Sequence, residues 1–238
     1  MPLIRKFIVS AAFAVLCATG ALAADMPVKA RPLAAVSSWS GWYLGAGGGY
    51  GMFNADHTSS LFGQPFLQPA IAGKGWFGTV QLGGDYQFAD RWVAGVFGDF
   101  DFSDIKGTAS ELVSITNFPL SQRNAYAAGA RIGYLVTPEI LSYLDGGYSR
   151  ANFNGGSLVF ATAPFAATGI VVPNQSYDGF FLGTGTEIMF SRGWSVKSEY
   201  RYARYGSSTI TVQPSSFFTE TLRPNVQTVR TSLIYKFN

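Results

Sequence analysis

The chain has 238 residues, of which 13% are charged, 16% are aromatic and 28 are glycine. The charged fraction is about half that of a typical soluble domain. Beyond the first residues, no run of about 18 apolar residues predicts a transmembrane helix. Apolar residues that are frequent but interrupted are typical of strands with one membrane-facing side and one polar side.

The first 23 residues have the pattern of a secretory signal. Arg5 and Lys6 precede an apolar stretch over 7–18, and Ala21-Leu22-Ala23 is a cleavage site. We therefore expect a mature chain that begins at Ala24, with an extended, proline-containing periplasmic lead-in over 24–38 and a barrel domain over 39–238.

Removing the signal changes what the composition implies. Cys17, the only cysteine, lies inside the signal, so the mature chain has no disulfide or thiolate chemistry. Without Arg5 and Lys6, 15 basic and 14 acidic residues remain. This near balance removes any argument for binding nucleic acid.

The next segments predict strands, because their side chains alternate with period two. In the hairpin over 75–104, Trp76, Val80 and Leu82 fall on an uncharged face, whereas Asp85 and Asp99 fall on the other. The residues at 88–91 make its tight turn. In chain order, strands are predicted over 39–54, 75–88, 92–104, 122–135, 140–153, 178–190, 194–205 and 225–238.

Short turns and long connectors alternate strictly between these eight strands. The long connectors run over 55–74, 105–121, 154–177 and 206–224, and strands with short periplasmic turns and long surface loops are typical of outer-membrane barrels. We therefore predict an all-β fold, an eight-stranded antiparallel transmembrane up-and-down β-barrel in the cell outer membrane. Aromatic residues near the short turns are predicted to form a membrane-facing girdle: Trp39, Trp42, Phe88, Trp92, Tyr134, Phe190, Trp194 and Phe237.

Charged residues decide which face of each strand points inward. In the strand over 194–205, one phase places Lys197, Glu199 and Arg201 inside, and the other places them in lipid, where Lys or Arg costs about 2–4 kcal/mol near the midplane. The same choice in every strand predicts an interior charge network: Asp85, Asp99, Asp101, Arg131, Asp145, Glu187, Lys197, Glu199, Arg201 and Arg230. Because eight strands enclose little more than their own side chains, we predict a closed interior, with Asp99 and Asp101 facing Lys197 and Arg201.

Several segments resemble the small outer-membrane immunogenic, porin-like barrel family of alphaproteobacteria. These segments are residues 39–45, 83–87, 92–104, 194–202 and 235–237. The resemblance covers essentially the whole mature chain, and it implies an eight-stranded outer-membrane barrel, in some members one that binds haemin. Such barrels usually end on an aromatic residue, whereas here Asn238 follows Phe237.

No catalytic residue and no metal site is predicted. His57, the only histidine, is placed in a surface loop near Ser59 and Ser60, where a hydrolase would need exact placement of serine and base. As a haemin ligand, His57 would supply one axial bond, although a solvated loop histidine is the simpler interpretation.

These observations favour a structural and surface-interaction protein that is not an enzyme. A narrow porin-like channel or a haemin-binding surface receptor is the alternative. The expected contacts are outer-membrane lipid and a surface partner at 55–74 and 154–177, with no nucleic acid, and the barrel is expected to be a monomer or a weak homo-oligomer. The segment over 154–177 is unusually apolar for a loop, and we expect it to lie outside the cell.

Overall fold

The computed structural model of the chain describes residues 38–67, 71–110, 116–160, 167–171, 173–211 and 218–237. The predicted signal over 1–23, nearly all of the lead-in over 24–38, and Asn238 lie outside these ranges. No helix among the described residues is long and apolar enough to cross a membrane.

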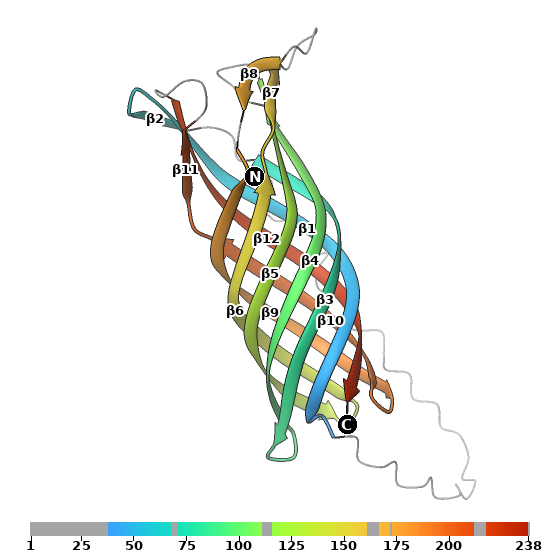
Figure 1. Cartoon of the computed structure of the whole chain (residues 1–238). Helices are drawn as coiled ribbons and strands as arrows, with labels where there is room; N and C mark the ends of the chain where they lie inside the picture. The colour runs from blue at the N-terminus through green and yellow to red at the C-terminus, as the bar shows by residue number, and fades with distance from the viewer. Residues whose placement is uncertain are drawn as a thin grey trace, which may run out of the picture. The chain divides into compact units, whose positions relative to one another are not determined.

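Eight long antiparallel strands close into a barrel, which confirms the predicted fold class (Figure 1). They are β1 (Gly41–Leu61), β3 (Ile71–Phe88), β4 (Trp92–Ser110), β5 (Thr116–Thr137), β6 (Ile140–Asn154), β9 (Gln175–Ser191), β10 (Trp194–Tyr205) and β12 (Phe218–Phe237). The barrel closes where β1 pairs with β12, from Trp42 opposite Phe237 to Leu61 opposite Phe218. Closure leaves none of these eight strands with an open edge within the wall.

Three short turns join the strands at one end of the barrel. They lie between Phe88 and Trp92, between Thr137 and Ile140, and between Ser191 and Trp194, as the alternation predicted. Gly193 takes a positive φ of 75° in the last of them, a conformation that glycine adopts without the steric cost of a Cβ.

The predicted long connectors are largely strand, which corrects the sequence interpretation. β1, β3, β4, β5, β6, β9 and β12 continue into them, and four short strands lie within them: β2 (Gln64–Leu67), β7 (Ser157–Phe160), β8 (Ala167–Val171) and β11 (Ser208–Thr211). In these extensions the outer positions are often polar, as at Lys106 and Arg223, so the period-two apolar pattern of the sequence fades. Inner positions such as Leu222 stay buried, and the backbone pairing continues. Strand β2 pairs with β1, and β11 pairs with β12, at the end of the barrel opposite the short turns (Figure 1).

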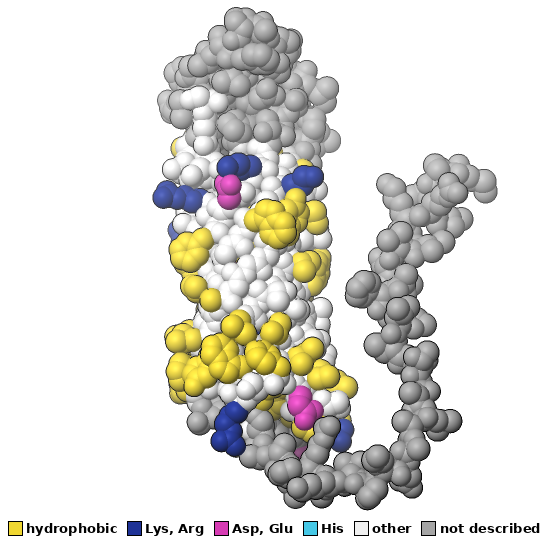
Figure 2. Space-filling model, turned by 90° about the vertical axis from the view of Figure 1, so that its right-hand side faces the viewer, with side chains coloured by type: hydrophobic (Ala, Val, Ile, Leu, Met, Phe, Trp, Pro, Cys, Tyr) yellow, Lys and Arg dark blue, Asp and Glu magenta, His cyan; other side chains and the backbone are white. Residues whose placement is uncertain are grey.

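The outer wall carries an apolar belt with aromatic residues at both levels. Figure 2 shows apolar side chains in a lower band and an upper group, with small and polar residues between them. Trp42 and Phe237 mark the lower level and Trp76 and Phe180 the upper level, with exposed fractions of 51–71%. An apolar belt with aromatic residues at both edges is typical of the surface that a transmembrane barrel presents to lipid.

Trp39 is a correction to the predicted aromatic girdle, because it is fully buried and not exposed to lipid. It precedes β1, and its indole Nε1 donates a hydrogen bond to the carbonyl oxygen of Pro138 at 2.9 Å. That bond holds the ring across the short-turn mouth, where it packs in a buried cluster with Val93, Leu135 and Met189.

Candidate functional site

The barrel interior consists of a charged zone between two apolar layers. The layer at the short-turn end contains Trp39, Val93, Leu135, Leu141 and Met189. The layer toward the long connectors includes Phe53, Ile105, Phe153, Tyr177 and Leu222. All ten residues of the predicted network lie between these layers, and none is more than 8% exposed.

Arg131 organises the charges nearest the short turns. Its guanidinium donates two hydrogen bonds to the carboxylate of Asp85, the Nε one at 2.8 Å, and Nη1 donates to Glu187 at 2.8 Å. The Lys236 ammonium also donates to Asp85 and lies 3.7 Å from Glu187. Because a bidentate arginine and a lysine share two carboxylates, the pairs form one connected network whose charges nearly compensate each other.

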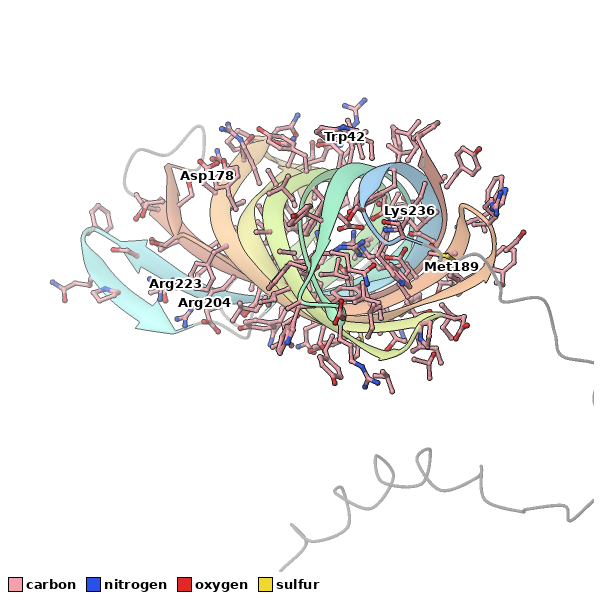
Figure 3. The ribbon with its side chains drawn as sticks, turned by 90° about the horizontal axis from the view of Figure 1, so that it is seen from below. Trp42, Asp178, Met189, Arg204, Arg223 and Lys236 are labelled. Atoms are coloured by element: carbon pink, nitrogen blue, oxygen red, sulfur yellow. The ribbon has the colours of Figure 1, made fainter. Side chains whose placement is uncertain are left out.

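Lys236 is a network member that the sequence interpretation omitted. It is 2% exposed, whereas its neighbours Tyr235 and Phe237 are 40% and 51% exposed. Figure 3, a view along the barrel from the short-turn end, shows Lys236 within the ring of strands and Trp42 outside it. Successive side chains of a strand point to opposite faces, so a strand with Tyr235 and Phe237 on the outer face must have Lys236 on the inner face.

A second group of charges lies deeper in the barrel around Arg201. Its guanidinium donates to Asp99 at 2.8 and 3.1 Å and to Glu199 at 2.9 Å. Arg230 donates to Asp101 at 3.1 and 3.3 Å and lies 3.5 Å from Asp99. Asp99 therefore links two arginines.

The structure places Lys197 away from the two aspartates that it was predicted to face. Its ammonium lies 3.1 Å from Glu199 and donates to the side-chain oxygen of Gln81 at 2.9 Å. Arg230 takes its place beside Asp99 and Asp101. Sequence alternation places a residue on the inner face, but the shear and tilt of the barrel decide which inner residues meet across it.

Aromatic rings separate the charged groups. The Arg201 guanidinium lies 4.1 Å from the ring centre of Phe181, and Lys197 lies 5.2 Å from that of Phe97. The Tyr143 hydroxyl donates to Glu199 at 3.1 Å. These contacts fill the space between the ion pairs with apolar surface, and cations over ring faces are favourable.

Asp145 differs from the other carboxylates. Both its oxygens are buried and accept no hydrogen bond within the described residues, and the nearest cation is Arg201 at 3.9 Å. A Cβ at Gly183, directly opposite in the register, would displace this carboxylate, so glycine at this position lets Asp145 lie close to the neighbouring strand. With Lys236 included, six carboxylates share the zone with five cations.

His57 is not in a loop, which corrects its predicted position. Its backbone lies in β1 opposite Leu222. In the described part of the chain, no group of three or more His, Cys, Asp or Glu side chains is placed to hold a metal ion.

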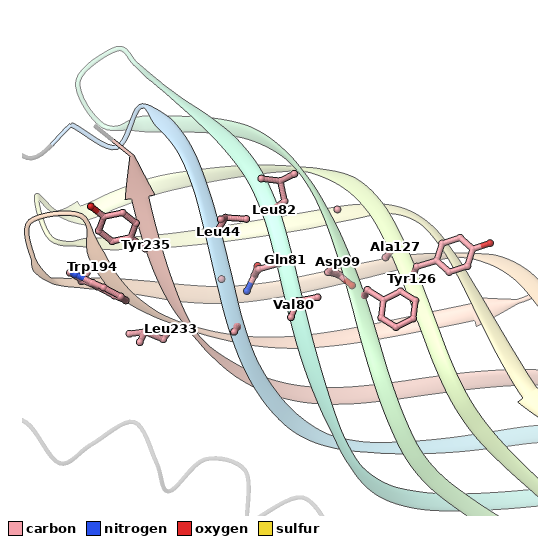
Figure 4. Close-up of a pocket in the computed structure, with 14 residues that line it drawn as sticks. Leu44, Val80, Gln81, Leu82, Asp99, Tyr126, Ala127, Trp194, Leu233 and Tyr235 are labelled. Atoms are coloured by element: carbon pink, nitrogen blue, oxygen red, sulfur yellow. The ribbon is translucent and has the colours of Figure 1, made fainter.

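A wide depression lies on the outer wall and not in the interior. It has a volume of about 860 Å³, and its lining includes Leu44, Val80, Leu82, Leu233 and Tyr235 (Figure 4). These side chains are 40–55% exposed on the membrane-facing side. Such a surface fits lipid chains and offers no cluster of polar groups for a water-soluble ligand.

A closed antiparallel barrel with an apolar belt and a polar interior is the architecture of bacterial outer-membrane proteins. The chain belongs to the outer membrane protein β-barrel domain family, whose model matches residues 9–237. This match confirms the predicted family resemblance and the outer-membrane location.

Named relatives agree with this assignment. The 31 kDa outer-membrane immunogenic proteins of Brucella melitensis and Brucella suis are 29% identical over 248 residues, covering 98% of this chain and 100% of each relative. Outer membrane protein P1 of Coxiella burnetii is 28% identical over 196 residues, 74% of this chain and 72% of the relative. Among solved structures, OprG from Pseudomonas aeruginosa superposes with a TM-score of 0.52 at 14% identity, over 85% of this chain and 99% of that one, which supports the fold alone.

Proposed function

We propose that this protein is a non-catalytic structural and surface-interaction barrel of the outer membrane, with an interior that does not conduct solutes. The observation that carries the proposal is the filled interior. The cavity beside Asp99, Arg201 and Arg230 has a volume of about 20 Å³, close to the ~10–15 Å³ that a single water needs. Apart from Asp145, the carboxylates of the charged zone are hydrogen-bonded to its cations, and apolar layers cover the zone on both sides.

The test is single-channel recording of the purified barrel in a planar bilayer. We expect no conductance steps from the wild type. An Arg201→Ala/Phe181→Ala variant removes a stacked pair from the centre of the barrel, so it tests whether the recording detects an opened interior. Stable ohmic steps from the wild type would contradict closure and favour the alternative, a narrow porin-like channel.

The surface role is proposed for the segments over 55–74 and 154–177. Strands β2, β7 and β8 lie within them, and Figure 1 places these strands beyond the barrel wall at the end opposite the short turns. Extended hairpins offer backbone edges and side chains to a partner. Replacing residues 62–70 and 155–174 by short glycine-serine turns keeps the buried residues Ile71 and Tyr177. These variants should leave the barrel folded and abolish binding of a surface partner.

Haemin binding through His57 is the receptor alternative. Because His57 is the only histidine, a His57→Ala variant should lose the axial-ligand absorbance change on haemin titration. An unchanged spectrum would remove this residue from consideration, and a wild type without any spectral change would remove the alternative itself.

A further inference from the structure

Charged side chains on the outer surface of the described residues gather at the two ends of the barrel. The long-connector end carries six cations, here called the basic rim: Lys74, Lys106, Arg123, Arg150, Arg204 and Arg223. Three carboxylates accompany them: Asp56, Asp104 and Asp178. The short-turn end carries two cations and two carboxylates: Asp90, Arg91, Glu139 and Arg192. Among the side chains that the structure describes, those at the long-connector end carry an excess of positive charge and those at the short-turn end balance.

Cations of the basic rim lie next to one another across neighbouring strands. Lys74 on β3 is directly opposite Lys106 on β4. Arg204 on β10 is opposite Asn225, two residues along β12 from Arg223, so the two arginines are diagonal neighbours, and Figure 3 shows them side by side outside the barrel. Like charges directly opposite each other, as at Lys74 and Lys106, are destabilising, and diagonal neighbours are within reach of long side chains. A shared anion would relieve the repulsion between such cations.

The accompanying carboxylates neutralise only part of the rim. Asp104 lies 2.7 Å from Lys106, and Asp178 lies 3.5 Å from Arg150. Asp56 is opposite Arg223 in the register, but no ion pair forms between them in the described part of the chain. Arg204 likewise has no carboxylate partner there.

The basic rim lies directly above the upper aromatic level. Arg204 is opposite Phe180, which is 58% exposed, and Lys74 is two residues from Trp76, which is 71% exposed. On the face in Figure 2, basic side chains lie just above the upper apolar group. Exposed aromatic residues of this kind mark the head-group level of a membrane, so the rim cations are at the height of lipid head groups.

We propose that the basic rim binds phosphate groups of membrane-lipid head groups, with Arg204 and Arg223 as the centre of the site. Guanidinium groups bind phosphate through paired N–H donors. The lipid chain would continue down over Phe180 and Tyr202, which lie on the same outer face. A lipid, unlike a free anion, uses both the cations and the apolar surface directly beneath them.

The test is titration of the full-length purified barrel in a neutral detergent with phosphatidate, followed by native mass spectrometry. One Arg near an anionic lipid surface contributes about fivefold in affinity, so Arg204→Gln/Arg223→Gln is expected to bind phosphatidate about 25-fold more weakly than the wild type. The matched control is Arg91→Gln/Arg192→Gln at the balanced short-turn end, which should bind as the wild type does.

Parallel titrations with phosphatidylcholine and inorganic phosphate identify what is recognised. Phosphatidylcholine that binds as tightly as phosphatidate would overturn the role of charge, and inorganic phosphate that binds as tightly would overturn the lipid as occupant. Equal losses in both double variants would overturn the location. If the rim variant does not fold, wild-type affinity at low and high salt provides the second measurement, because exposed charges are screened; a salt-independent affinity would also overturn the proposal.

Discussion

At the scale of single residues, the interior ion pairs are the positions where one substitution should have the largest effect. Replacing a buried pair by well-packed apolar residues is often neutral, whereas removing one partner leaves the other charge stranded. The side chains of Arg131, Arg201 and their carboxylate partners are only 0–5% exposed. Removing one of them would therefore leave a buried charge without its partner.

Arg201→Ala should therefore lower the free energy of unfolding by about 3–5 kcal/mol. The substitution removes the hydrogen bonds to Asp99 and Glu199 and the contact with the Phe181 ring. Urea titration of the barrel in zwitterionic lipid vesicles measures it. The control is Arg204→Ala, three residues along the same strand but exposed on the outer face. Equal stabilities of the two variants would contradict a dry, paired interior.

Trp39 should stabilise the barrel although it precedes the first strand. It is fully buried and held by the bond to Pro138, and the Lys236 ammonium lies 4.9 Å from its ring centre. Trp39→Ala should cost about 3–5 kcal/mol, the usual loss for a large buried aromatic residue. Trp42→Ala, three residues later on the lipid side, should cost less. The reverse order in urea unfolding would show that Trp39 does not cover the mouth.

At the scale of elements, the two ends of the barrel have different construction. Short turns close one end, whereas paired strands extend β1, β5 and β12 at the other. Bacterial outer-membrane barrels keep short turns in the periplasm and long loops outside, so we expect β7 and β8 at the cell surface.

Protease added to intact cells should therefore cut between β6 and β9 and leave the short turns uncut. The cleavage sites are located by identifying the fragments by mass spectrometry. Cleavage at residues 88–92 in intact cells, or cleavage between β6 and β9 only after the outer membrane is opened, would invert the orientation.

At the scale of the whole molecule, charges are sorted into three groups. The described charged side chains lie inside the barrel, on the basic rim with its carboxylates, or at the short-turn end. The outer wall between the basic rim and the short-turn end carries no described charged side chain. This sorting follows from the cost of placing a charge in hydrocarbon.

Because the interior ion pairs are buried, salt should hardly change the stability of the barrel. Exposed pairs are screened by salt, and buried pairs much less. We expect the free energy of unfolding in zwitterionic vesicles to be nearly the same at low and high sodium chloride. A large decrease at high salt would indicate that water and ions reach the charged zone.

The sequence by itself determined the number of barrel strands, the three short turns and the inward phase of every strand. It could do so because hydrocarbon tolerates no charge, so the alternation of apolar and charged residues between, for example, Trp194 and Tyr202 has one solution.

Only the tertiary structure decided which interior charges meet, that Trp39 turns inward, and that the connectors continue as paired strands. Partners such as Asp99 and Arg201 lie on strands far apart in the sequence, and barrel tilt sets their height. The pairing of β1 with β12 continues past the apolar belt, where exposed polar residues such as Asp56 and Arg223 on the outer face interrupt the pattern that made the other strands predictable.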